Sequence, residues 1–331
     1  MRRNSGQAAA PFRTGILVTL ACVCLAGGAI AADYPSRPVR FVSPFAAGGG
    51  NDMISRILAQ ALTRTLGQSV VVDNRPGANT IVGMELVARA NADGHTLILT
   101  STTQPINAVL YPKLPYDSIG DFAPISIVAS SPLLVVVHPS LPVTTVAELV
   151  AFAKAKPGQL FFPSSGPGNI SHLAGELFNT MAQVQMVHVP YKGAGPRNTD
   201  LLAGRVQLVF SAAPAILPYV ESRKLRAIAV TTKARSSVLP ALPTVAEAGL
   251  PGYEASTWYG VLAPAHTPKT VIARLHADIV KALGFPEVRS WFAEQGLDVI
   301  GSTPEQFAAY VEAEIGKWAN VIRVARITAT P

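Results

Sequence analysis

The sequence predicts an α/β protein of two lobes, each a largely parallel sheet flanked by helices. Three observations favour this fold class. The 331 residues exceed the size at which one hydrophobic core usually keeps growing. Apolar residues make up 49% of the chain and charged residues only 14%, a composition that fills buried sheets. Short β-rich runs alternate with amphipathic helical runs, as they do where helices connect parallel strands.

The first 31 residues differ from the rest of the chain. Three arginines accompany an uncharged stretch that begins at Gly15 and ends in the small-x-small triplet Ala29-Ile30-Ala31. Its strongly apolar part, residues 16–25, is shorter than the about 20 residues that span a bilayer. We therefore expect residues 1–31 to be a signal peptide that exports the chain to the periplasm.

The cysteine content and the charge narrow the function further. Both cysteines, Cys22 and Cys24, lie in the predicted signal peptide, so the mature chain has no disulfide and no thiolate metal site. The formal charge of +7 includes the three arginines and no acid from residues 1–31, which leaves +4 in scattered positions. Nucleic-acid binders show clustered Lys and Arg instead. The charge favours a weak attraction for anionic solutes.

The mature chain opens with a strand, a loop and a helix. Residues 39–42 form the expected strand and residues 43–50 a glycine-rich loop. Apolar residues at three- and four-residue spacing then predict a helix over 53–66, with Asn51 or Asp52 as its N-terminal cap. The next elements are a strand at 70–72, a helix near 81–90 and a strand at 96–99. This part of the chain is a β-α-β-α-β series.

A second series of the same kind begins after an apolar run at 133–137. The sequence Thr145-Val146-Ala147-Glu148 is a capping box, which predicts the start of a helix. A strand at 160–162, a loop of small residues at 164–168 and a helix from Ile170 repeat the pattern of the first series. Further strands are expected at 187–190, 206–210 and 226–230.

The last part of the chain has one strand, at 258–263, and then reads as helical to its end. The helices are predicted at 270–283, 286–295 and 304–324. Because a helical tail needs a sheet to pack on, we expect it to return to the first lobe. One lobe then holds residues 33–130 and 255–331, the other holds residues 131–254, and two strands form a hinge between them.

Each of the two small-residue loops joins a strand end to the start of a helix, where anions bind. Backbone N–H groups there lack partners in the helix, and the helix dipole favours negative charge. Two such loops on opposite lobes predict a cleft that holds both ends of a small carboxylate. The alternative for Gly48, Gly49 and Gly50 is a tight turn with nothing bound.

Further polar residues follow strand ends where such a cleft is expected: Ser101, Thr102, Ser164, Ser165 and the Tyr191-Lys192-Gly193 turn. Hydroxyl groups can orient a carboxylate. Lys192 is the candidate charged contact, although a lone lysine after a strand is more often a surface residue. Asp52 fits a helix cap better than a ligand contact, because its charge repels a carboxylate.

Several motifs occur in a fixed order along the mature chain. They are Tyr34-Pro35-x-Arg37-Pro38, Pro44-Phe45-Ala46-Ala47-Gly48-Gly49, Asp52, Asn74-Arg75-Pro76-Gly77-Ala78, Asp93-Gly94, His188-Val189-Pro190-Tyr191-Lys192-Gly193 and Pro243-Thr244-x-x-Glu247-x-Gly249. By these motifs the chain resembles the Bug family, the TctC-like solute receptors of tripartite tricarboxylate transporters. The resemblance implies a type II periplasmic-binding-protein fold, in which a two-stranded hinge joins two α/β lobes around a ligand cleft.

The resemblance also implies capture of a carboxylic acid, largely through backbone amides and bridging waters. The implied acid is a di- or tricarboxylate, an amino acid or an aromatic acid, and the implied partner is the membrane part of a transporter or a sensor protein. The candidate ligand residues are Phe45, Ala46, Ala47, Gly48, Gly49, Asn51, Asp52, Ser101, Thr102, Ser164, Ser165, Gly166, Gly168, Ser171, Tyr191, Lys192, Gly193 and Ser211. The chain departs from the family's commonest pattern at Ser211, often an acid, and at Asn79-Thr80, usually a glycine pair.

An enzyme is the main alternative, a secreted hydrolase that uses Ser165 or Ser171 with His172. No G-x-S-x-G motif occurs, and the helix neighbours Ser171 and His172 cannot face each other. The six histidines show no metal-ligand spacing. We therefore expect a monomeric binding protein without enzymatic activity, metal, cofactor or nucleic-acid partner.

Overall fold

The computed structural model describes residues 34–191, 193–236 and 239–328. The predicted signal peptide with both cysteines, and the candidate ligand residue Lys192, lie outside these residues. No helix in the described part of the chain is long and apolar enough to cross a membrane.

The first series folds as predicted into three parallel strands and two helices. The elements are β1 (Val39–Ser43), α1 (Gly50–Leu66), β2 (Val70–Asn74), α2 (Ile81–Ala88) and β3 (Thr96–Ser101). β1 lies between β2 and β3 and pairs with both in parallel. A 3₁₀ turn, η1 (Ala78–Thr80), and a short helix, α3 (Thr103–Leu110), follow β2 and β3. Because the strands are parallel, the loops after β1 and β3 lie at the same edge of the sheet.

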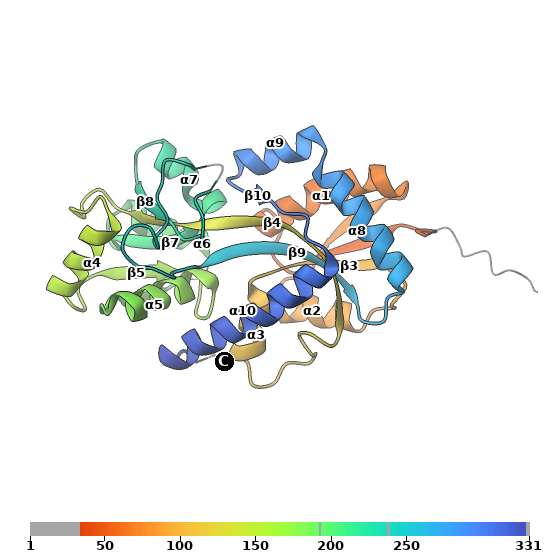
Figure 1. Cartoon of the computed structure of the whole chain (residues 1–331), viewed down its shortest axis with the longest axis horizontal. Coiled ribbons are helices and arrows are strands. Elements are labelled where there is room, and N and C mark those ends of the chain that lie inside the picture. The colour runs from red at the N-terminus through yellow and green to blue at the C-terminus, as the bar shows by residue number, and fades with distance from the viewer. Residues whose placement is uncertain (1–33, 192, 237–238, 329–331) are drawn as a thin grey trace, which may run out of the picture. The chain divides into compact units, whose positions relative to one another are not determined.

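Two long strands connect the first sheet region with the second. β4 (Phe122–Val137) and β9 (Ser256–Pro264) pair antiparallel and run side by side through the middle of Figure 1. β9 also pairs with β3, whereas residues 133–137 of β4 pair with β7 (Leu208–Ala212) and residues 134–137 pair with β8 (Arg226–Val230). The single strand β4 therefore belongs to both regions, and the predicted two-stranded connection is confirmed.

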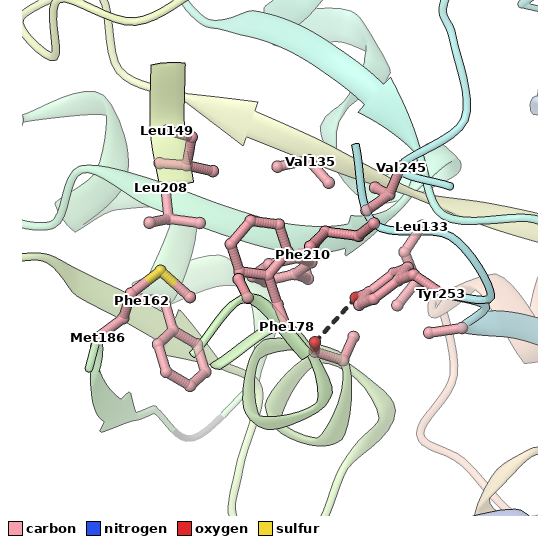
Figure 2. Packing of buried hydrophobic residues seen from close by; sticks show 14 of the residues in the cluster. Leu133, Val135, Leu149, Phe162, Phe178, Met186, Leu208, Phe210, Val245 and Tyr253 are labelled. Atoms are coloured by element: carbon pink, nitrogen blue, oxygen red, sulfur yellow. Dashed lines mark hydrogen bonds between the residues drawn. The ribbon is translucent and has the colours of Figure 1, made fainter. Parts of the chain in front are cut away.

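The second region has its own apolar core. Its other elements are α4 (Val146–Ala155), β5 (Phe161–Ser164), α5 (Ile170–Ala182), β6 (Val187–Pro190), α6 (Ala194–Leu202) and α7 (Ala213–Glu221). The predicted capping box forms at the start of α4. Phe162, Phe178 and Phe210 pack in the centre of this core (Figure 2). The Tyr253 hydroxyl satisfies its hydrogen bond there by donating to the carbonyl of Ala174 at 2.8 Å.

The C-terminal elements pack on more than one part of the fold. They are α8 (Lys269–Leu283), α9 (Pro286–Glu294), β10 (Asp298–Val299) and α10 (Pro304–Val324). Leu275 of α8 and Phe292 of α9 join the core formed with β1 and β3. α10 packs on two apolar clusters: Phe307 packs on Trp258 of β9, with ring centroids 5.4 Å apart, and Trp318 lies in the core of the second region. The lobe boundaries at residues 130 and 255 stay a prediction.

Candidate functional site

Both glycine-rich loops line one cavity of about 430 Å³. Four of the predicted ligand residues line it: Phe45 in the first loop, Ser165 and Gly166 in the second, and Gly193 before α6. Five lining residues were not among those predicted, namely Asn79, Leu110, Tyr111, Pro167 and Asn169. The volume is in the range of small-molecule sites.

Another cavity, of about 390 Å³, lies against β9 and α10, where Trp258 and Tyr310 line it. None of the predicted ligand residues lines this cavity. We place the candidate site in the cavity of about 430 Å³ because residues from both loops meet there.

Asp52 anchors the first loop. This side chain is buried, and its carboxylate accepts hydrogen bonds from Gly48 N–H at 2.8 Å, Arg56 Nε at 3.0 Å and Asn74 Nδ2 at 2.8 Å. Burial alone raises the pKa of Asp52, but the three hydrogen bonds outweigh burial and hold the pKa below its ordinary value. The carboxylate therefore stays charged while it holds the loop's own backbone, and its oxygens do not line the cavity.

The prediction that Asn51 or Asp52 caps α1 is wrong. Gly49 occupies the N-cap position, and no side chain caps the helix. The buried Asn51 side chain instead accepts from Ser43 Oγ at 2.9 Å and donates to the carbonyl of Leu99 at 3.1 Å. It ties the start of α1 to the ends of two strands.

The missing cap leaves backbone donors at the start of α1. Within the residues that the structure describes, the N–H groups of Gly50, Asn51 and Asp52 form no hydrogen bond. The turn before them is formed at Gly48, the one residue of this loop with a positive φ, 80°. Unpaired N–H groups at the positive end of a helix dipole form a site for an anion.

The second loop uses its amides differently. Three of its N–H groups donate to nearby side chains: Ser165 to Ser171 Oγ at 3.3 Å, Gly166 to Ser164 Oγ at 3.1 Å and Gly168 to His172 Nδ1 at 3.1 Å. The expectation of free amides on both loops is therefore wrong for the second loop. At this side of the cavity the Ser165 hydroxyl and the Asn169 side-chain amide are the side-chain donors that the loop offers.

Two stacked imidazoles support the second loop. The ring centroids of His172 and His188 lie 3.6 Å apart, and the ring planes differ by 11°. His172 Nδ1 accepts from Gly168 N–H, and His188 Nε2 lies 2.6 Å from Ser164 Oγ. Burial, together with the neighbouring His172, lowers the pKa of His188 to about 3. His188 is therefore neutral at pH 7.

Because the pKa of His188 is low in the folded protein, we expect the free energy of unfolding to fall as the pH drops from about 6.5 towards about 3. An unfolded chain protonates this residue at the upper end of that range, whereas the folded protein does so only at the lower end. The unfolded state binds more protons in between, which favours unfolding. Urea unfolding should show that His188→Gln loses less stability than the wild type between pH 7 and pH 5. The variant His266→Asn, at an exposed position, is the control, and an unchanged pH profile in His188→Gln would contradict the assignment.

The remaining predicted ligand residues do not line the cavity: Ala46, Ala47, Gly48, Gly49, Asn51, Asp52, Ser101, Thr102, Ser164, Gly168, Ser171, Tyr191 and Ser211. Thr102 Oγ1 donates to the carbonyl of Ser256 and accepts from Trp258 N–H, which ties the end of β3 to β9. The Tyr191 hydroxyl donates to Asp200 at 2.7 Å. Ser211 is fully buried and accepts from Arg197 Nη2 at 2.8 Å. These side chains position the elements around the cavity.

Asn79 lines the cavity from a strained turn. Ala78, Asn79 and Thr80 have φ angles of 44°, 52° and 78°, in a region that is costly for a β-branched residue such as threonine. Asn107 holds the turn, since its Nδ2 donates to the Asn79 carbonyl and its Oδ1 accepts from Asn79 Nδ2, both at 2.7 Å. The sequence signalled this position only as a departure from a usual glycine pair. Backbone strain of this kind gathers at ligand sites.

The site lacks the geometry of a serine hydrolase. Ser164 Oγ and His188 Nε2 are close, but Ser164 is fully buried. Ser171 Oγ donates to Asn169, and His172 Nδ1 already accepts a backbone N–H. Over residues 34–328, apart from 192 and 237–238, no group of three or more His, Cys, Asp or Glu side chains is placed to hold a metal ion. The described geometry suits binding of an anion.

Comparisons with known proteins agree over most of the chain. The family model described as tripartite tricarboxylate transporter family receptor matches residues 54–327. Protein BugT of Bordetella pertussis is 38% identical over 308 residues, which cover 92% of this chain and 94% of that protein. A solved R. palustris protein with adipate is 40% identical with a TM-score of 0.81, and the match covers 89% of this chain and 99% of the other. MatC from Rhodopseudomonas palustris with bound malate is 31% identical with a TM-score of 0.76, and the match covers 87% of this chain and 100% of the other.

Proposed function

The chain belongs to the tripartite tricarboxylate transporter receptor family, and on that premise we propose that it captures a small organic carboxylate in the cavity of about 430 Å³. The family consists of periplasmic solute-binding receptors and not of enzymes. The observation that carries the proposal is the set of unpaired N–H groups at the start of α1, which follows the loop that contributes Phe45 to the cavity. Adipate and malate in the related structures support a carboxylate as the ligand.

The two loops hold the two ends of this ligand. One carboxylate reaches beyond Phe45 to the start of α1, where it accepts hydrogen bonds from the N–H groups of Gly50, Asn51 and Asp52, three residues that do not themselves line the cavity. The other end lies against Ser165 and Gly166 of the second loop. A ligand that touches both loops favours the conformation in which they are closest, because it makes more contacts there.

The receptor works outside the cytoplasm with a membrane partner. The predicted signal peptide over residues 1–31 directs it to the periplasm, where the family acts, and cleavage leaves a mature chain that begins at or near Ala32. The partner is the membrane part of a tripartite transporter, with a sensor protein as the second candidate. Lobes of residues 33–130 with 255–331 and of residues 131–254 close on the ligand within one monomer.

A thermal-shift screen on the mature chain tests the proposal. The panel holds adipate, malate, citrate, glutamate and benzoate, with adipamide as an uncharged control. An acid at a hundred times its Kd adds about 2.7 kcal/mol to the free energy of unfolding, which raises the Tm by several degrees. Calorimetry on each acid that raises the Tm gives the Kd. A panel in which no acid raises the Tm above the adipamide control would contradict the proposal.

A further inference from the structure

A buried arginine lies directly behind the second loop. Arg197 of α6 is 2% exposed. Its guanidinium donates to Ser165 Oγ at 3.2 Å from Nη1 and to Ser211 Oγ at 2.8 Å from Nη2. Nε and Nη2 also donate to Asn198 Oδ1, at 3.1 and 2.9 Å, and the Asn198 amide is fixed because its Nδ2 donates to the carbonyl of Ala215.

The acceptors around Arg197 are all neutral. In the part of the chain that the structure describes, the guanidinium forms no ion pair, and Asp200, three residues further along α6, is bound by Tyr191 and Arg205 instead. Burial lowers the pKa of Arg197 to about 10, which still leaves it charged at pH 7. Buried charges in proteins are usually paired with an opposite charge. Burying a cation without an opposite charge costs free energy of folding, unless a bound anion compensates the charge.

We infer that Arg197 is a specificity-determining residue, which holds an uncompensated positive charge behind Ser165 for an anionic group of the ligand. The inference rests on the proposed function. Ser165 Oγ accepts from Arg197, so the hydroxyl proton of Ser165 remains available to donate into the cavity that Ser165 lines. Arg197 itself does not line the cavity, and it therefore acts through Ser165 and through its charge. The end of the ligand at the second loop is thus a carboxylate and not an amide or a hydroxyl.

The charge can be neutralised without removing the arginine. Ser211→Asp places a carboxylate where Arg197 Nη2 now donates to a hydroxyl, whereas Ser211→Asn is a side chain of nearly the same size without charge. We expect the ligand-free Ser211→Asp protein to melt at a higher temperature than Ser211→Asn, because only aspartate pairs the buried cation. Equal melting temperatures, or a lower one for Ser211→Asp, would overturn the inference whether or not any acid binds.

Binding of matched probes tests the effect on the ligand. Adipate carries a carboxylate at both ends, and its monoamide carries one at one end only. We expect wild type and Ser211→Asn to prefer adipate over the monoamide, and Ser211→Asp to lose about tenfold of that preference. A merely structural role of Arg197 would change the affinity for both probes alike, and an equal preference in the two variants would overturn the inference. If the proposed function itself is wrong, the wild type binds none of the acids, which is a different result.

Discussion

Replacing Gly50 with proline is expected to weaken carboxylate binding by about tenfold to about 150-fold while the fold keeps its stability. Gly50 is the first residue of α1, where proline is well tolerated because the N–H has no partner in the helix. Gly49, with φ of −82° and ψ of 166°, already has the extended conformation that a residue before proline requires. The substitution removes one backbone hydrogen-bond donor. A hydrogen bond to a charged group contributes about 1.5–3 kcal/mol, which gives the expected loss.

The matched control is Gly50→Ala, which keeps the N–H group. A Cβ at this position meets only the Tyr259 hydroxyl, at 3.9 Å, so the alanine methyl group does not disturb the packing. Calorimetry with adipate measures the Kd of both variants, and thermal melts followed by circular dichroism measure their stability. If Gly50→Pro binds as tightly as Gly50→Ala, the ligand does not use this amide, and a different set of donors holds the carboxylate.

The alternating strands and helices were predictable because the sequence patterns that specify them span only a few residues. The apolar spacing over 53–66 and the capping box before α4 are of this kind. The helices α6 and α7 gave no such signal, because both are short and contain proline, Pro196 in the first and Pro214 and Pro218 in the second. Only residues 133–137 of β4 were predicted, since the earlier part carries Pro124 and Ser126 and is held by pairing with β9.

The candidate site was predictable where the chain leaves the end of a strand for a loop. That local order indicated Phe45, Ser165, Gly166 and Gly193, which line the cavity. Arg197 reaches Ser165 across 32 residues of chain, and the stacking of His172 on His188 depends on how α5 packs against β6. Contacts of this kind come from tertiary packing, which no short pattern encodes.

Gly168 marks the place where the second loop meets α3. Its φ is 70°, and a Cβ built there lies 2.2 Å from Leu110 Cδ2, a side chain that lines the cavity. We expect Gly168→Ala to lower the affinity for adipate by about tenfold to about a hundredfold. Overpacking costs about 1–3 kcal/mol, which the loop relieves by moving away from α3, and a left-handed alanine adds strain of about 1–2 kcal/mol.

Shortening Leu110 distinguishes the two causes of the lost affinity, overpacking against Leu110 and backbone strain at residue 168. Leu110→Val removes the atom that the new methyl group would meet, so the double variant Gly168→Ala/Leu110→Val should recover about tenfold of the lost affinity. The strain at φ 70° remains, and recovery is therefore incomplete. Calorimetry on both single variants and the double variant gives the coupling between the two sites. A double variant that binds no better than Gly168→Ala would show that contact between the second loop and Leu110 does not control the affinity, and that strain in the loop alone does.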